Sequence, residues 1–70
     1  MDAREQFAAN LRAERKRLKL SQEALGHSCD LNMSEISRLE RCDRDPRLAT
    51  IVKLAKALGI PPSKLLDGIP

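Results

Sequence analysis

The side chains that do chemistry in proteins are few in this 70-residue chain, and their spacing fits no catalytic site. His27 is the only histidine, and Cys29 and Cys42 are the only cysteines. The sequence pairs no histidine with a nucleophile, and it has neither a cluster of metal ligands nor a glycine-rich phosphate loop. We therefore expect a protein that is not an enzyme and that needs no metal and no cofactor.

Arginine is the residue whose spacing indicates binding, because a guanidinium group can hold an anion with two hydrogen bonds. Four arginines recur every three residues in the middle of the chain: Arg38, Arg41, Arg44 and Arg47. Further cations crowd the first twenty residues: Arg4, Arg12, Arg15, Lys16, Arg17 and Lys19. Because the net charge is only +3, the distribution of the cations along the chain is more informative than the net charge itself. It is compatible with a polyanion partner, although a solvated helix surface is the simpler explanation of charge alone.

The two cysteines fit a reducing compartment better than a disulfide framework. A redox switch would give them a function, but Cys29 falls on the buried side of its predicted helix, where thiols usually pack inertly. We expect Cys42 to be the more accessible thiol. No stretch approaches the roughly twenty apolar residues that span a bilayer, so we expect a cytoplasmic protein with no membrane partner.

Helices are the elements that must position these side chains. The apolar residues are leucine, isoleucine and alanine with a single aromatic residue, Phe7, which favours helix packing over a sheet. The fold class is therefore all-α, a compact five-helix bundle in one domain over residues 1–70. The five segments are expected at about residues 3–18, 22–29, 33–41, 48–58 and 63–67.

Capping residues mark where these helices begin. Asp2 with Glu5 predicts a capping box, and Asn32 with Glu35 predicts a second one. Ser21 caps the second segment. Helical spacing then predicts the inward-facing positions, among them Leu11, Leu18, Leu20, Leu25, Cys29, Ile36, Leu39, Leu48, Ile51, Leu54, Ala55, Leu58, Leu65 and Leu66.

Two short segments between Ser21 and Glu40 lie barely three residues apart and need a scaffold, because helices of this length do not form alone. The runs SQEALG, DLNMSEISRLERCDRDP and IVKLAKALGI resemble the Cro and phage-repressor helix-turn-helix family, often called Xre-like. The resemblance extends from about Leu11 to Leu66. It implies the phage-repressor type of helical domain, with the helix-turn-helix in the second and third segments.

The resemblance implies that residues 33–41 form a recognition helix that lies in the major groove of double-stranded DNA. The implied base-reading residues are Asn32, Met33, Ser34, Ser37 and Arg38. These positions fall opposite Ile36 and Leu39, and Arg38 could hold guanine O6 and N7 with two bonds. Plain helix capping explains Asn32 and Glu35 equally well.

A second set of residues is implied to contact DNA phosphates: Ser21, Gln22, Arg41, Arg44 and Arg47. Such contacts supply affinity and salt dependence rather than sequence reading. For each of these residues taken singly, an ordinary helix-start position or a solvated loop is an alternative explanation. The resemblance also implies an internal ion pair of Arg15 with Glu40, a structural role that removes Arg15 from the DNA-facing cations.

Three residues depart from the family's pattern. Asp30 and Cys42 stand where the family usually or often has glycine, before and after the recognition helix. Aspartate tolerates the left-handed conformation, whereas Cys42 leaves the geometry of its turn open. Gly26 replaces the usual alanine and should weaken its helix by roughly 1 kcal/mol.

The function implied is a sequence-specific DNA-binding transcriptional regulator. One such module reads too few base pairs to select a genomic site, so we expect a homodimer on a palindromic operator. The dimer contacts are expected at Leu65, Leu66 and Ile69, unless the two leucines seal the core. The alternative function is a protein-interaction module with the same fold and no DNA binding.

Stand-alone family members of this size include Cro-type repressors, controllers of restriction–modification operons and antitoxin-like autoregulators. The sequence favours a small autoregulator without choosing among these kinds. Met1 fits a natural start, although a DNA-binding fragment of a longer repressor stays open.

Overall fold

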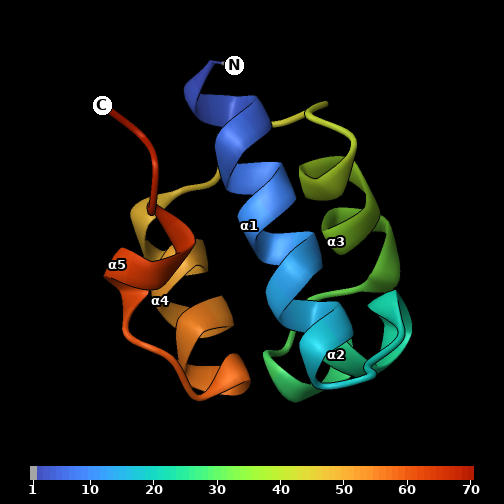
Figure 1. The fold of residues 1–70 in the computed structure, drawn as a ribbon. Coiled ribbons are helices and arrows are strands. Elements are labelled where there is room, and N and C mark those ends of the chain that lie inside the picture. The colour runs from blue at the N-terminus through green and yellow to red at the C-terminus, as the bar shows by residue number, and fades with distance from the viewer. Residues whose placement is uncertain (1) are drawn as a thin grey trace.

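The computed structural model describes residues 2–70, and these residues form five helices and no strand (Figure 1). The helices are α1 (Ala3–Arg17), α2 (Gln22–Ser28), α3 (Met33–Glu40), α4 (Leu48–Leu58) and α5 (Pro62–Leu65). The predicted all-α fold class is confirmed. The last helix is shorter than predicted, a single turn that begins at a proline.

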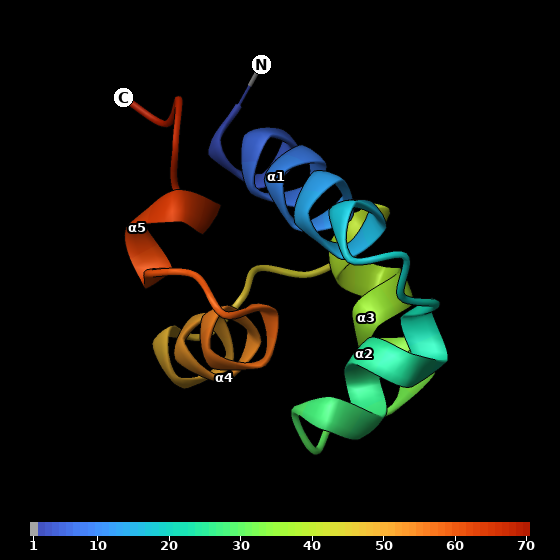
Figure 2. The same cartoon turned by 60° about the horizontal axis from the view of Figure 1, so that its bottom comes forward.

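The helices close a ring of contacts around one core. α1 packs against α3 and α5, α3 packs against α2, and α2 and α5 both pack against α4. In Figure 2 the pair α2 and α3 lies on one side of the molecule and the pair α4 and α5 on the other, with α1 between them at the top. The two short helices therefore have the scaffold that their length requires.

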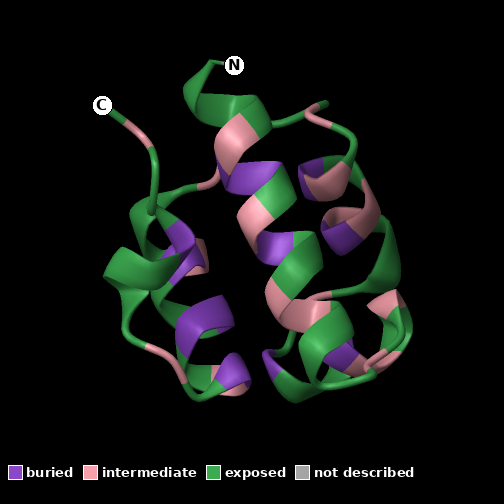
Figure 3. Cartoon of the chain, in the orientation of Figure 1, coloured by how far each residue is buried: buried purple, intermediate pink, exposed green. Residues whose placement is uncertain are grey.

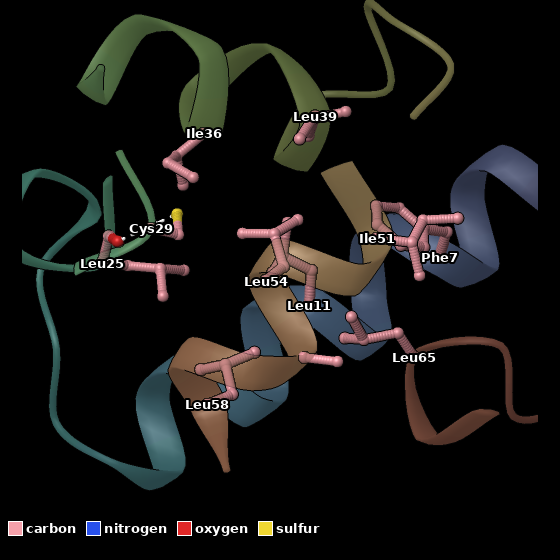
Figure 4. Packing of buried hydrophobic residues seen from close by; sticks show 11 residues of the cluster. Phe7, Leu11, Leu25, Cys29, Ile36, Leu39, Ile51, Leu54, Leu58 and Leu65 are labelled. Atoms are coloured by element: carbon pink, nitrogen blue, oxygen red, sulfur yellow. Dashed lines mark hydrogen bonds between the residues drawn. The ribbon is translucent and has the colours of Figure 1, made fainter. Parts of the chain in front are cut away.

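Every helix contributes at least one almost fully buried side chain to this core, and the largest of them are Leu11, Leu25, Ile36, Leu54 and Leu65. Figure 4 shows Leu11 and Leu54 at the centre, with Leu25, Cys29 and Ile36 on one side and Phe7, Ile51 and Leu65 on the other. Because side chains from all five helices pack together in this one core, the position of any one helix depends on all the others.

The ends of the first three helices follow the predicted capping residues. The Asp2 carboxylate accepts a hydrogen bond from the Glu5 N–H at 2.8 Å and the reciprocal bond is present, so this capping box is confirmed. The hydrogen bond lowers the pKa of Asp2. Ser21 accepts from the Ala24 N–H at 3.0 Å.

The second predicted capping box is only half formed. Asn32 accepts a hydrogen bond from the Glu35 N–H at 2.8 Å, but no bond returns from the Glu35 side chain to the Asn32 backbone among the described residues. The Glu35 side chain instead lines a hollow between α3 and the loop that follows it. The reciprocal part of this prediction was therefore wrong.

Figure 3 shows that buried and exposed residues alternate along the helices. Three leucines predicted to face inward are exposed: Leu18 at 39%, Leu48 at 78% and Leu66 at 42%. Leu18 and Leu66 are the C-caps of α1 and α5, and Leu48 is the first residue of α4. Each lies at a helix end, where the apolar stripe continues in the sequence but the elements formed by residues 2–70 leave the side chain partly or largely uncovered.

The predicted dimer contacts are also corrected by the structure. Leu65 is completely buried and cannot contact a second copy of the chain. Ile69 is half-buried and packs against the core. Of the three predicted dimer contacts, only Leu66 is exposed. The alternative in which Leu65 and Leu66 both seal the core was therefore wrong as well.

One amide side chain links α1 to the C-terminal end of α5 and the residues that follow it. Asn10 of α1 donates hydrogen bonds to the carbonyls of Leu65 at 2.9 Å and Asp67 at 2.8 Å. The N- and C-terminal ends consequently lie at the same end of the molecule (Figures 1 and 2). Within residues 2–70, no helix is long and apolar enough to span a bilayer.

Candidate nucleic-acid interface

The turn between α2 and α3 is built on a close approach of backbone at Gly26. The Leu31 N–H donates to the Gly26 carbonyl at 2.8 Å. A Cβ atom on Gly26 would lie 2.7 Å from the Leu31 oxygen and 3.2 Å from the Asn32 carbonyl carbon. The expected cost of glycine in this helix thus comes with a close approach that the sequence did not indicate: an alanine Cβ atom at this position would require the turn to shift.

Residues with a left-handed backbone conformation flank α3 on both sides. Asp30 has a φ of 60° and Cys42 a φ of 64°, so both adopt the conformation for which the family uses glycine. The turn geometry that the sequence left open at Cys42 is thus the glycine-like one. In that turn the Asp43 N–H donates to the Arg38 carbonyl at 2.9 Å, which satisfies a carbonyl in the last turn of α3.

The outer face of α3 brings the predicted base-reading residues together. Asn32, Met33, Ser34 and Arg38 are exposed and Ser37 is half-buried, whereas Ile36 and Leu39 on the opposite face are buried. The side chains of Ser34, Ser37 and Arg38 make no hydrogen bond or ion pair with any residue from 2 to 70. Their donors and acceptors are free to bind a partner.

The carboxyl end of α3 is anchored through Glu40. Arg15 donates two hydrogen bonds to this carboxylate, from Nε at 2.6 Å and from Nη2 at 2.9 Å. The Glu40 side chain is only 4% exposed and that of Arg15 only 11%. The implied ion pair is thus present, and the bond to Glu40 raises the pKa of Arg15.

Two further contacts complete this anchor, and the sequence had indicated neither. Arg15 Nη1 donates to the Leu20 carbonyl at 2.8 Å, which holds the segment between α1 and α2. The Gln22 amide donates to Glu40 Oε1 at 3.2 Å. Gln22, predicted to contact a phosphate, therefore lies against Glu40, and its second N–H is left for another acceptor. Ser21 likewise uses its oxygen as a cap and keeps its hydroxyl hydrogen to donate.

The three remaining phosphate candidates lie in and beside the loop from Cys42 to Arg47. Arg41 is 3.3 Å from Asp43 in an exposed ion pair. Arg44 and Arg47 line the hollow that also contains Glu35 and Thr50. Arg47 is the N-cap of α4, and within residues 2–70 no side-chain capping bond is made to the first N–H groups of this helix.

The two cysteines occupy the environments predicted for them. Cys29 is 7% exposed, its thiol donates to the Leu25 carbonyl at 3.2 Å, and burial raises its pKa. Cys42 is half-buried, and both thiols are free. No group of three or more histidine, cysteine or acidic residues within the described chain could hold a metal ion.

This helix-turn-helix fold occurs in known proteins. The family model HTH_3, described as helix-turn-helix, matches residues 11–65. The control protein C.BamHI of Bacillus amyloliquefaciens is 48% identical over 48 residues, which are 69% of this chain and 59% of that protein. The match thus spans less than two thirds of that relative's length.

Two solved structures superpose closely on this chain. The restriction-modification controller protein C.AhdI of Aeromonas hydrophila is 39% identical with a TM-score of 0.86, over 89% of this chain and 94% of that one. The c2 repressor of phage P22, in complex with a synthetic operator, is 37% identical with a TM-score of 0.81, over the same two shares. By sequence and by fold, the chain belongs to the Xre-like helix-turn-helix family.

Proposed function

We propose that this protein is a sequence-specific DNA-binding transcriptional regulator that inserts α3 into the major groove. The observation that carries this proposal is the outer face of α3, where exposed polar side chains have no partner within residues 2–70 and the helix itself is anchored through Glu40. The likeness to a repressor crystallised with its operator supports the same docking. A rigid helix with free donors is what base reading requires.

Base reading is assigned to the five residues already located on α3 and its cap. Arg38 binds a guanine through O6 and N7, and Met33 contacts a thymine methyl group. Ser34 and Ser37 bind as donors or acceptors. Asn32 uses its carbonyl oxygen as a helix cap, so only its NH₂ group is left for a base.

Phosphate binding is assigned to residues on either side of α3. Ser21 and Gln22 approach one stretch of the DNA backbone from the start of α2. Arg41, Arg44 and Arg47 approach another from the loop before α4. These contacts fix the register of the helix and supply the salt-dependent part of the affinity.

We further propose a homodimer that binds a palindromic operator in the cytoplasm. Leu66 is the one predicted dimer contact that is exposed, and α4, which packs against α5, exposes Leu48 and Val52. These three apolar side chains, on two adjoining elements, are suited to a contact with a second copy. Sedimentation over a range of concentrations tests this, and a monomer throughout would contradict it.

Among the kinds of small regulator considered above, the relatives favour a controller of a restriction–modification operon. C.BamHI is named a control protein and C.AhdI a restriction-modification controller. Whether the chain represses or activates depends on where its operator lies relative to the promoter.

Selection from random duplex DNA at moderate salt, followed by sequencing of the bound fragments, tests the proposed function. We expect a two-fold symmetric motif with half-sites about 34 Å apart. Binding that is weak, salt-sensitive and without an enriched motif would contradict base reading. The protein-interaction function would then be tested by pull-down with the folded chain.

A further inference from the structure

The loop that joins α3 to α4 is held in place by a residue that is far away in the sequence. Arg4, in the first turn of α1, is 2.7 Å from Asp45 through Nε. Its Nη1 donates to the Cys42 carbonyl at 3.2 Å. Its own carbonyl lies 4.0 Å from the Cys42 sulfur. One arginine thus contacts both the start of the loop and one of its two acidic side chains.

The conformation of this loop needs such support. Cys42 has a φ of 64°, which is unfavourable for a residue with a Cβ atom and persists only when surrounding contacts hold it. Within the loop, the Asp43 N–H to Arg38 carbonyl bond fixes one side of the turn. The Arg4 contacts fix the side that faces α1.

We propose that Arg4 is a positioning residue for the DNA-facing loop, acting through Asp45 and the Cys42 carbonyl. By fixing these two points, Arg4 sets the direction in which Arg44 and Arg47 leave the loop. It also neutralises Asp45, whose carboxylate would otherwise repel a phosphate strand. This inference rests on the proposed function for its link to DNA, but the loop contact itself can be tested without DNA.

Cys42 supplies a reporter for that contact. Its thiol is half-buried in the turn that Arg4 holds, whereas Cys29 is buried in the core. We expect Arg4→Ala to raise the rate at which iodoacetamide alkylates Cys42 by about fivefold, because an exposed ion pair contributes up to about 1 kcal/mol. Peptide mapping by mass spectrometry separates the two thiols, and the Cys29 rate should not change.

Arg12→Ala is the matched control, since Arg12 is an exposed arginine of the same helix with no side-chain partner within residues 2–70. It removes the same charge and should leave the Cys42 rate unchanged. An unchanged Cys42 rate in Arg4→Ala, or an equal rise in Arg12→Ala, would overturn the proposal.

A charge exchange separates positioning from direct phosphate binding. Arg4→Glu should weaken binding to the selected operator about tenfold, because two carboxylates would face each other beside the DNA. Adding Asp45→Arg should restore most of this loss. If the double variant binds as weakly as Arg4→Glu, Arg4 contacts DNA itself and the proposal is wrong. If the wild-type chain selects no operator, the proposed function fails, while the thiol result still decides whether Arg4 holds the loop.

Discussion

At its carboxyl end α3 is fastened to α1 and α2 through the buried carboxylate of Glu40, whereas at its amino end the side chains of Met33 and Ser34 face solvent. The two ends differ in what their polar groups do. At the anchored end, donors and acceptors are satisfied within the fold. At the open end, apart from the cap at Asn32, they are left for a partner.

This difference separates stability from recognition along a helix of eight residues. A short helix that bound DNA with both ends free would have to be ordered at the moment of binding, which lowers affinity. Here the ordering is already complete in the free protein. Substitutions at the anchored end should therefore change folding, and those on the open face should change binding alone.

The largest effect should come from removing the anchor. Glu40→Ala leaves the Arg15 guanidinium buried without its counter-charge, and we expect a loss of about 3–5 kcal/mol of unfolding free energy. Urea denaturation followed by circular dichroism measures it. Glu23→Ala, which removes an exposed carboxylate of α2, is the control and should cost at most about 1 kcal/mol.

A double variant sharpens this test. Arg15→Met with Glu40→Leu replaces both charges by apolar side chains of similar length and should recover more than half of the lost stability. Equal stability of Glu40→Ala and the wild type would show that this end of α3 is not anchored by the pair.

A substitution in the turn before α3 should also destabilise the fold, for a steric rather than an electrostatic reason. Gly26→Ala forces a Cβ atom against the Leu31 carbonyl, and we expect about 1–3 kcal/mol of destabilisation. Helix propensity alone predicts the opposite sign, a gain of about 1 kcal/mol. Urea denaturation thus separates the two explanations, and a stabilised variant would rule out the close approach.

On the open face of α3 and in the loop that follows it, substitutions should change binding and leave stability unchanged. Arg38→Ala should lose about 1–3 kcal/mol of discrimination at one base position. Arg44→Ala should weaken binding to all sequences alike and reduce the slope of log affinity against log salt by about one. Both variants should unfold within about 0.5 kcal/mol of the wild type. Competition assays with single-base operator variants test this, and a uniform loss for Arg38→Ala would contradict base reading.

The smallest effects should come from the left-handed residues that flank α3. Cys42→Gly should stabilise the fold by up to about 1 kcal/mol, because glycine adopts this backbone conformation without a steric penalty. Asp30→Gly should gain less, since aspartate tolerates the same conformation better. Thermal unfolding of the two variants side by side compares the two turns, and destabilisation of both would contradict the argument.

Much of this arrangement could be predicted from the sequence because it depends on local patterns. Helical spacing identified Leu11, Ile36 and Leu54 as core residues, and the capping residues placed the starts of α1, α2 and α3. The Arg15–Glu40 pair followed from the family resemblance. Where a stripe of leucines reached a helix end, as at Leu48, periodicity could not say whether a neighbour covered it.

What the sequence could not indicate were contacts between residues far apart in the chain. The Gln22 amide against Glu40 and the Arg4 side chain against Cys42 and Asp45 depend on how whole helices cross. The close approach at Gly26 depends on a backbone oxygen that no pattern of side chains encodes. These are the contacts that fix how α3 and its neighbouring loop are presented.

The Asn10 amide that joins α1 to the segment after α5 makes the path of the chain almost a closed ring. A short flexible bridge could connect the two ends, and new ends could be opened at the exposed Gly59 between α4 and α5. Such a circular permutant would keep the same packing with a different order of helices along the chain. The permuted domain could then be inserted into a loop of a larger protein with α3 still facing outward.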